Sequence, residues 1–267
     1  MPESRQVQVF RSRCEYLEQH IQVVDAALNL VTDAIDAGVS ALPTNKRTGA
    51  TLAEALNFDT TDYPRLQKLP ARQWDRTLHT HSERRNYEFA LGELYAYFDE
   101  YVRSIVEGLP ISAARYPAAA ADSVELKADR VKMLLRGNLD LDRAVGESIM
   151  QKIRAKRFGK GMAEELCRLF ELDLDHRLQH YAHFVLDVRN ALIHHSGRVS
   201  KSLVKEYGKL LKTELDVEVE KSLKLNFEFV SAAVLGIKTY MAHLDGMLLN
   251  KGYLVPHNVT PRIHQRH

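Results

Sequence analysis

The hydrophobic positions of this chain recur at intervals of three and four residues over several long stretches, which is the spacing of one face of an α-helix. The longest stretch lies at the N-terminus and runs for four heptads. Gly38 follows its last member and Pro43 lies beyond, so we expect the helix to end at this glycine. Pairing with another subunit and packing along the chain's own helices both produce this pattern, and both interpretations are open. The apolar positions are Val7, Phe10, Cys14, Leu17, Ile21, Val24, Leu28, Val31 and Ile35.

Further helical patterns follow, and Pro and Gly residues separate them. A second long helix is predicted from about residue 82 to 109, where Pro110 ends it. The acidic–apolar alternation that follows Leu215 predicts one short extended piece. The fold class is therefore all-α, a helical bundle with a long N-terminal heptad-patterned helix. Other helices are predicted near residues 123–136, 141–157, 161–171, 178–196 and 226–249. The predicted segments are 1–80 (long helix and irregular connector), 81–255 (helical domain) and 256–267 (polar tail, expected to be mobile).

Composition narrows the class of protein. The chain has 267 residues, 45% of them hydrophobic and 27% charged, as in an ordinary soluble protein. The net charge of +2 predicts no global attraction to nucleic acid, so any such surface must be local. Two cysteines, Cys14 and Cys167, have no metal-binding spacing and indicate buried thiols in a reducing compartment. With no signal-peptide pattern and no membrane-length apolar run, we expect a cytoplasmic protein.

The helix before Gly197 has an unusual polar face. Asn190 and His194 are one turn apart and lie opposite the apolar stripe, with His183 and Asp187 beside them. Arg189 lies at the edge of the stripe, so its long side chain is needed to reach the same place. The pattern predicts one half of a polar site. The stripe consists of Leu178, Tyr181, Val185, Val188 and Leu192.

The segment from Arg189 to His194 fits the Arg-x4-His motif of the HEPN superfamily. Residues 158–174, 195–199 and 96–102 resemble flanking segments of the prokaryotic group of that superfamily that includes the RiboL-PSP-associated forms. The resemblance covers roughly residues 81 to 250. It implies a helical bundle of HEPN type that acts as a metal-independent endoribonuclease.

The residues suit that chemistry. Attack of an RNA 2′-OH on the adjacent phosphorus needs one group that takes a proton and one that gives a proton, and histidine serves either role. An arginine fork stabilises the charge that develops on the phosphate. The resemblance implies a homodimer with a composite site, products with 2′,3′-cyclic phosphate ends, and Arg189, Asn190 and His194 as the catalytic set. It also suggests Asp99 or Glu100 as a carboxylate that orients Arg189.

No cofactor is expected. His183, Asp187 and His194 share a face, but His194 is too far along the helix to bind the same metal ion as the other two. A basic segment and a cation beyond the central helix are candidates for RNA binding. For the basic segment a solvated helix end, favoured by the helix dipole, is the preferred interpretation, because only Phe158 interleaves the charges. These cations are Lys152, Arg154, Lys156, Arg157, Lys160 and Arg198.

The resemblance also implies a biological role, as a toxin or phage-defence effector with RNA as substrate and a separate antitoxin or defence protein as partner. Some HEPN toxins have a tyrosine, two residues after the motif histidine, that the antitoxin modifies. Here Ser196 occupies that position, which argues against this mode of neutralisation. The alternative function is a non-catalytic HEPN module that binds nucleotide, RNA or a partner protein with the same polar face. A helical scaffold in which Arg189 and His194 only cap or form ion pairs is the third interpretation.

Overall fold

The computed structural model describes residues 3–57, 66–108, 124–137, 140–155, 160–195, 197–215 and 222–257. This part of the chain is helical and contains no β-strand, which confirms the all-α prediction. None of the described helices is long and apolar enough to cross a membrane. The helices are α1 (Arg5–Ala41), α2 (Thr44–Arg47), α3 (Leu52–Leu56), the 3-10 helix η1 (Leu66–Lys68), the π-helix η2 (Trp74–His79), α4 (Thr80–Gly108), α6 (Ala128–Leu135), α7 (Leu141–Ala155), α8 (Lys160–Leu169), α9 (His176–His194), α10 (Lys201–Leu215) and α11 (Phe227–Asn250).

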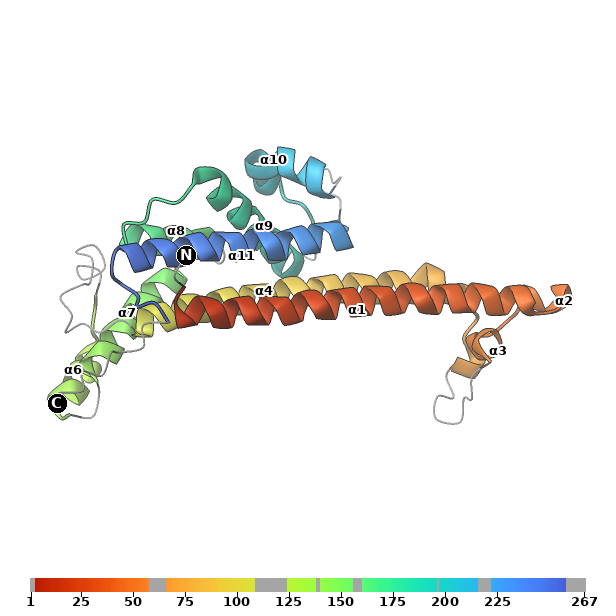
Figure 1. Ribbon diagram of the computed structural model, residues 1–267, viewed down its shortest axis with the longest axis horizontal. Helices are drawn as coiled ribbons and strands as arrows, with labels where there is room; N and C mark the ends of the chain where they lie inside the picture. The colour runs from red at the N-terminus through yellow and green to blue at the C-terminus, as the bar shows by residue number, and fades with distance from the viewer. Residues whose placement is uncertain are drawn as a thin grey trace, which may run out of the picture.

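Two long helices, α1 and α4, form the base of the molecule. They run side by side in opposite directions, and α11 packs on both (Figure 1). The apolar face of α4, from Tyr87 to Ile105, is buried against them. The N-terminal half of the predicted α1 face, from Val7 to Ile21, joins the same core. These α1 side chains are therefore buried within the chain's own bundle.

The second half of α1 projects beyond this core and carries a smaller hydrophobic cluster (Figure 1). Ile35 packs there with residues of the connector, among them Leu52 and Ala55 of α3. Trp74 packs against the same cluster, and its indole nitrogen donates to the Thr32 hydroxyl at 2.9 Å, as expected of a packing anchor. The division of the chain into segments 1–80 and 81–255 stays a prediction.

The predicted end of α1 was wrong by one turn. The helix continues through Gly38 to Ala41. A Cβ atom at position 38 would lie 1.7 Å from the carbonyl oxygen of Ala55. Gly38 is therefore explained by the close approach of α3 and not by the termination of α1.

A buried carboxylate holds the N-terminus against α11. Asp245 is only 1% exposed and accepts hydrogen bonds from the Ser4 backbone amide at 2.9 Å, from the Ser4 hydroxyl and from the Tyr101 hydroxyl at 2.9 Å. Ser4 also caps α1, since its hydroxyl accepts from the amide of Val7 at 3.1 Å. The start of α1, the C-terminal part of α4 and the end of α11 are thus joined at Asp245.

The central helix α9 begins and ends at residues that suit these positions. The Asp175 side chain accepts from the amides of Arg177 and Leu178 at 2.8 and 3.0 Å, an N-terminal cap. At the other end Gly197 has φ +74°, the left-handed conformation that a glycine after a helix commonly adopts. Its amide donates to the carbonyl of Ala191 at 3.0 Å. The helix packs on α4, α8 and α11, so its orientation is set on three sides.

Candidate functional site

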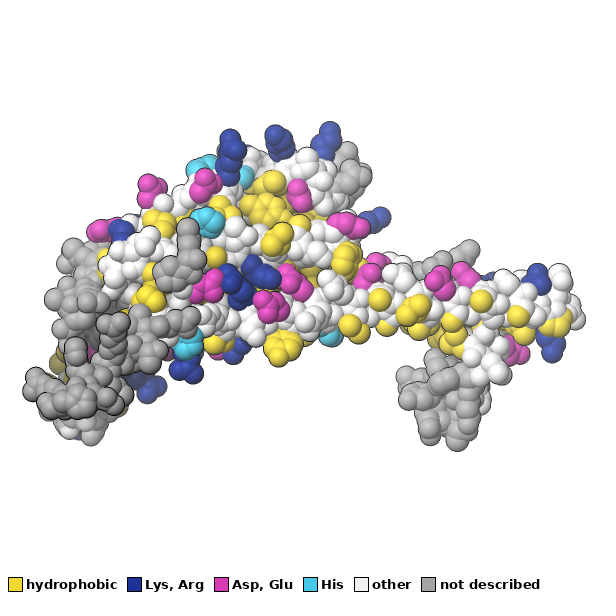
Figure 2. Space-filling model, viewed as in Figure 1, with side chains coloured by type: hydrophobic (Ala, Val, Ile, Leu, Met, Phe, Trp, Pro, Cys, Tyr) yellow, Lys and Arg dark blue, Asp and Glu magenta, His cyan; other side chains and the backbone are white. Residues whose placement is uncertain are grey.

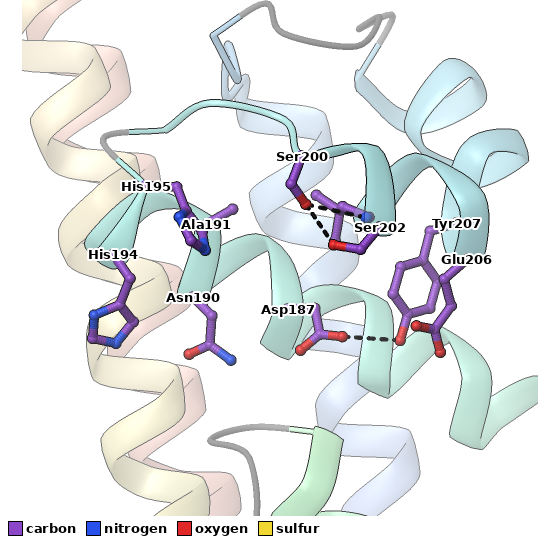
Figure 3. A pocket seen from close by; sticks show the side chains of 10 residues that line it. Asp187, Asn190, Ala191, His194, His195, Ser200, Ser202, Glu206 and Tyr207 are labelled. Atoms are coloured by element: carbon purple, nitrogen blue, oxygen red, sulfur yellow. Dashed lines mark hydrogen bonds between the residues drawn. The ribbon is translucent and has the colours of Figure 1, made fainter.

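A hollow of about 320 Å³ lies between α9 and α10. Figure 3 shows Asp187, Asn190 and His194 projecting from the same side of α9. His194 is the last residue of the helix and is exposed to solvent, whereas Asp187 and Asn190 are half-buried. The sequence prediction that Asn190 and His194 share one face, with Asp187 beside them, agrees with this arrangement.

The opposite wall of the hollow comes from α10. Tyr207 is buried, and its hydroxyl donates to Asp187 at 3.2 Å (Figure 3). Burial, reinforced by the Asp187 carboxylate, raises the pKa of Tyr207 above its ordinary value. The backbone of α10 is kinked at Tyr207, with φ −123° and ψ 22°. Ser200 caps the start of this helix by accepting from the Leu203 amide at 3.2 Å.

Arg189 points to a different hollow, on the α4 side of the helix. Its guanidinium carbon lies 4.1 Å from the centre of the Tyr95 ring, a cation–π contact. One terminal nitrogen donates to the Asn190 side-chain oxygen at 3.4 Å, and Nε is buried without a hydrogen-bond partner. Burial lowers the pKa of Arg189, while Tyr95 acts in the opposite direction. Among the described residues no carboxylate forms an ion pair with this guanidinium. The expectation that Arg189 reaches the hollow beside His194 is therefore not met within one chain.

The two carboxylates predicted to orient Arg189 have other partners. Asp99 accepts two hydrogen bonds from Arg154, at 2.5 and 3.3 Å. Glu100 pairs with Arg13, and this contact lowers the pKa of Glu100. Both acids line the same open hollow as Arg189, so they lie in the predicted region. The predicted contact with Arg189 is wrong, because each acid is paired with a different arginine. The cause lies in packing, because α7 and α1 each bring an arginine to α4.

The predicted basic segment is partly neutralised. Lys152 pairs with Glu125 at 2.9 Å and Arg154 with Asp99, so both of these cations have a counterion. Lys156 and Arg157 lie outside the described residues, as does the side chain of Lys160. Arg198 is exposed just beyond α9 and stays a candidate for RNA binding.

His183 does not face the site as predicted. It is only 5% exposed, and its Nδ1 lies 3.8 Å from the Glu164 carboxylate of α8. The helix period places His183 on the polar side, but α8 packs over that part of α9. Within the described part of the chain no three His, Cys, Asp or Glu side chains are grouped as ligands for one metal ion.

Sequence reasoning missed Tyr95 and Tyr207, which position Arg189 and Asp187. Tyr95 lies on a helix that also buries other aromatic side chains, and Tyr207 falls on the buried apolar face of α10, so periodicity alone gives neither residue a distinct signal. Tyr95 directly precedes the 96–102 segment that resembles the HEPN helix. This position is the only feature of the sequence that indicates a role for Tyr95 near the site.

Comparisons of this chain with protein-family models, with curated proteins and with solved structures found no match.

Proposed function

We propose that this protein is a metal-independent endoribonuclease of the HEPN type, with a composite site formed by two copies of the chain. It cleaves RNA to leave 2′,3′-cyclic phosphate ends. Its residues are Arg189, Asn190 and His194 on α9. Such a nuclease would need restraint in its own cell, so the proposal includes a role as toxin or phage-defence effector with a separate restraining partner.

The observation that carries the proposal is the setting of Arg189. Its guanidinium is partly desolvated at an open hollow and forms no ion pair with a described carboxylate. A desolvated charge without a counterion is unfavourable for folding. An incoming phosphate would supply that counterion and accept the two parallel hydrogen bonds of the fork. Tyr95 holds the planar group in place beforehand, which favours catalysis because little reorganisation is needed on binding.

His194 and Asn190 supply the rest of the chemistry. The exposed imidazole of His194 can take the proton of the 2′-OH or give one to the 5′-leaving oxygen. The bond from the 2′-oxygen to phosphorus forms as the bond to the 5′-oxygen breaks, which leaves a cyclic phosphate and a 5′-hydroxyl. Asn190 lies one turn before His194 and also contacts Arg189, so it links the two hollows.

The separation of Arg189 and His194 supports a site shared by two copies. One chain presents the two side chains to different hollows, on either side of α9. A single phosphate therefore does not meet both in one chain. A second α9 across a cleft would bring the arginine of one copy towards the histidine of the other. It would also supply the second proton-transfer group that the reaction needs.

The test is cleavage of single-stranded RNA and of transfer RNA in excess chelator. Wild type is compared with Arg189→Ala and His194→Ala. Arg177→Ala and His176→Ala are matched controls, because they remove the same residue types from the exposed first turn of the same helix. We expect cyclic-phosphate products from wild type and both controls, and a loss of roughly 100-fold or more in each site variant. Cleavage that requires added metal would overturn the proposal.

A binding module without cleavage is the second candidate, and the divergence of Arg189 and His194 within one chain favours it. A purified protein that binds RNA but leaves it intact would support this candidate. In that case Arg189→Ala should lose affinity, because the phosphate contact is removed, and His194→Ala should not.

A further inference from the structure

A second row of apolar and small side chains runs along α1, on a face distinct from the one buried in the bundle. From Tyr16 to Ala34 its members are spaced by four and three residues in alternation, as in a coiled-coil seam. The larger side chains are well exposed, at 70% for Tyr16, 67% for Val23 and 68% for Leu30. Val9 extends the row by one heptad and is 45% exposed. The row, called here the outer seam, consists of Val9, Tyr16, His20, Val23, Ala27, Leu30 and Ala34.

The outer seam is long and straight enough to receive another helix. Val9 and Leu30 are 21 residues apart on one continuous helix, a rise of about 31 Å at 1.5 Å per residue. Figure 2 shows hydrophobic side chains spaced along the projecting part of α1. The seam positions hold no lysine, aspartate or glutamate, and the arginine at the position between Val9 and Tyr16, Arg13, is paired with Glu100. A face of this composition is typical of a buried contact between helices.

The charges of α1 are divided between its two ends. Residues 5–13 hold three arginines and no acidic residue, whereas residues 14–41 hold five acidic residues and neither lysine nor arginine. Arg5 at one end and Asp33 and Asp36 at the other are exposed. Some of the remaining charges are already engaged, as Arg13 is with Glu100. A partner helix must therefore be acidic beside the start of α1 and lack acidic residues beside its end.

An antiparallel copy of α1 meets these requirements, and we propose that two copies of this chain pair through the outer seam. In the register where Val9 faces Leu30 of the partner subunit, Tyr16 faces Val23 of the partner subunit. The same two-fold register brings Arg5 level with the segment of the second copy that contains its acidic end. A parallel pairing would place arginine beside arginine and aspartate beside aspartate, which is unfavourable.

The centre of this pairing lies at His20, where α4 adds another apolar group. The ring of Phe89 is 51% exposed and lies 5.7 Å from the imidazole of His20. Near a two-fold axis both copies present this pair to the same place. The contact thus combines two long helix faces with an aromatic group at the middle, the region where interface residues contribute most to binding.

The first test is the mass of the full-length protein in solution. Light scattering after size exclusion, at tens of micromolar chain, should give at least a dimer for wild type, and a larger assembly where the contact across α9 forms as well. A Val23→Lys/Leu30→Lys variant buries two unpaired charges in the pairing, so self-association should weaken by roughly 100-fold or more. Gln22→Lys is the matched control, because it adds the same charge at an exposed neighbouring position off the seam. A monomeric wild type, or a double variant that associates as wild type does, would overturn the proposal.

Cysteine cross-linking tests the orientation. The native thiols of Cys14 and Cys167 are buried, so introduced cysteines dominate the reaction. His20→Cys should form a disulfide with its own copy across the two-fold axis. Val9→Cys should not cross-link to itself, but should cross-link when mixed with Leu30→Cys protein. Self-cross-linking of Val9→Cys would show a parallel pairing and refute the antiparallel arrangement.

The pairing stands apart from the proposed cleavage chemistry. The outer seam lies on α1, and the hollow beside His194 lies between α9 and α10. Mass and cross-linking are measured without RNA, so the pairing can fail while cleavage is observed, or hold while cleavage is absent.

Discussion

Replacement of Arg189 by methionine separates a functional arginine from a structural one. Arg189→Met keeps an unbranched chain of similar length that can still cover the Tyr95 ring, and it removes the charge. If the guanidinium is there to receive phosphate, cleavage should be lost while the fold keeps its stability. This combination is unusual, because most substitutions of half-buried residues destabilise.

The contacts of Arg189 set the expected change in the free energy of unfolding. A cation–π contact such as that between Arg189 and Tyr95 contributes about 0.5 to 2 kcal/mol. Against it stands the desolvation of a guanidinium whose Nε has no hydrogen-bond partner and whose pKa is lowered by burial. An unsatisfied buried polar group costs about 1–3 kcal/mol. The two contributions are similar in size and opposite in sign, so the free energy of unfolding should change by less than about 1 kcal/mol.

The assay is thermal unfolding followed by circular dichroism, beside RNA cleavage on the same samples. A change below about 1 kcal/mol corresponds to a shift of less than about 4 °C in Tm for a chain of this size. Arg154→Met is the matched comparison, because that arginine forms a two-bond ion pair with Asp99 and should lose about 1 kcal/mol or more. If Arg189→Met instead unfolds at a much lower temperature than Arg154→Met, then Arg189 supports the fold and the argument for a phosphate receptor fails.

Three further outcomes follow from packing and burial. Asp245→Asn should lower the free energy of unfolding by about 2–4 kcal/mol in urea titrations, because the buried carboxylate loses charge-assisted hydrogen bonds such as that from Tyr101; an unchanged midpoint would contradict this. Gly38→Ala should leave the helix content intact but cost about 1–3 kcal/mol and speed proteolysis of the connector, since the added methyl group collides with Ala55. Burial raises the pKa of Cys14 to about 12, above the ordinary thiol value, so the folded state favours the neutral thiol. The contribution of Cys14 to stability is therefore complete below about pH 9 and is lost as the pH rises towards 12, and urea unfolding at pH 8 and pH 10 should show a smaller pH slope for Cys14→Ala than for wild type.

The repeating pattern of side chains was enough to predict the helices and much of what they bury. The faces of α1 and α4 were predictable because a helix has a fixed period and each buried member recurs on it, as from Tyr87 to Ile105. The left-handed Gly197 was predictable for a similar reason, since only local backbone sterics are involved. The shared face of Asn190 and His194 follows from the same period.

The periodicity of a helix does not encode which element packs against each of its faces. Only the tertiary structure determines these partners. The helix period puts His183 on the polar side of α9, and α8 then covers it. Asp99 and Glu100 form ion pairs with arginines from helices distant in sequence, and Arg189 instead packs on the ring of Tyr95. The spacing of the outer seam can be read from the sequence. Its exposure cannot, because it depends on the bundle covering the other face of α1. Local sterics and periodicity act within a helix, whereas partners and exposure depend on which helices pack together.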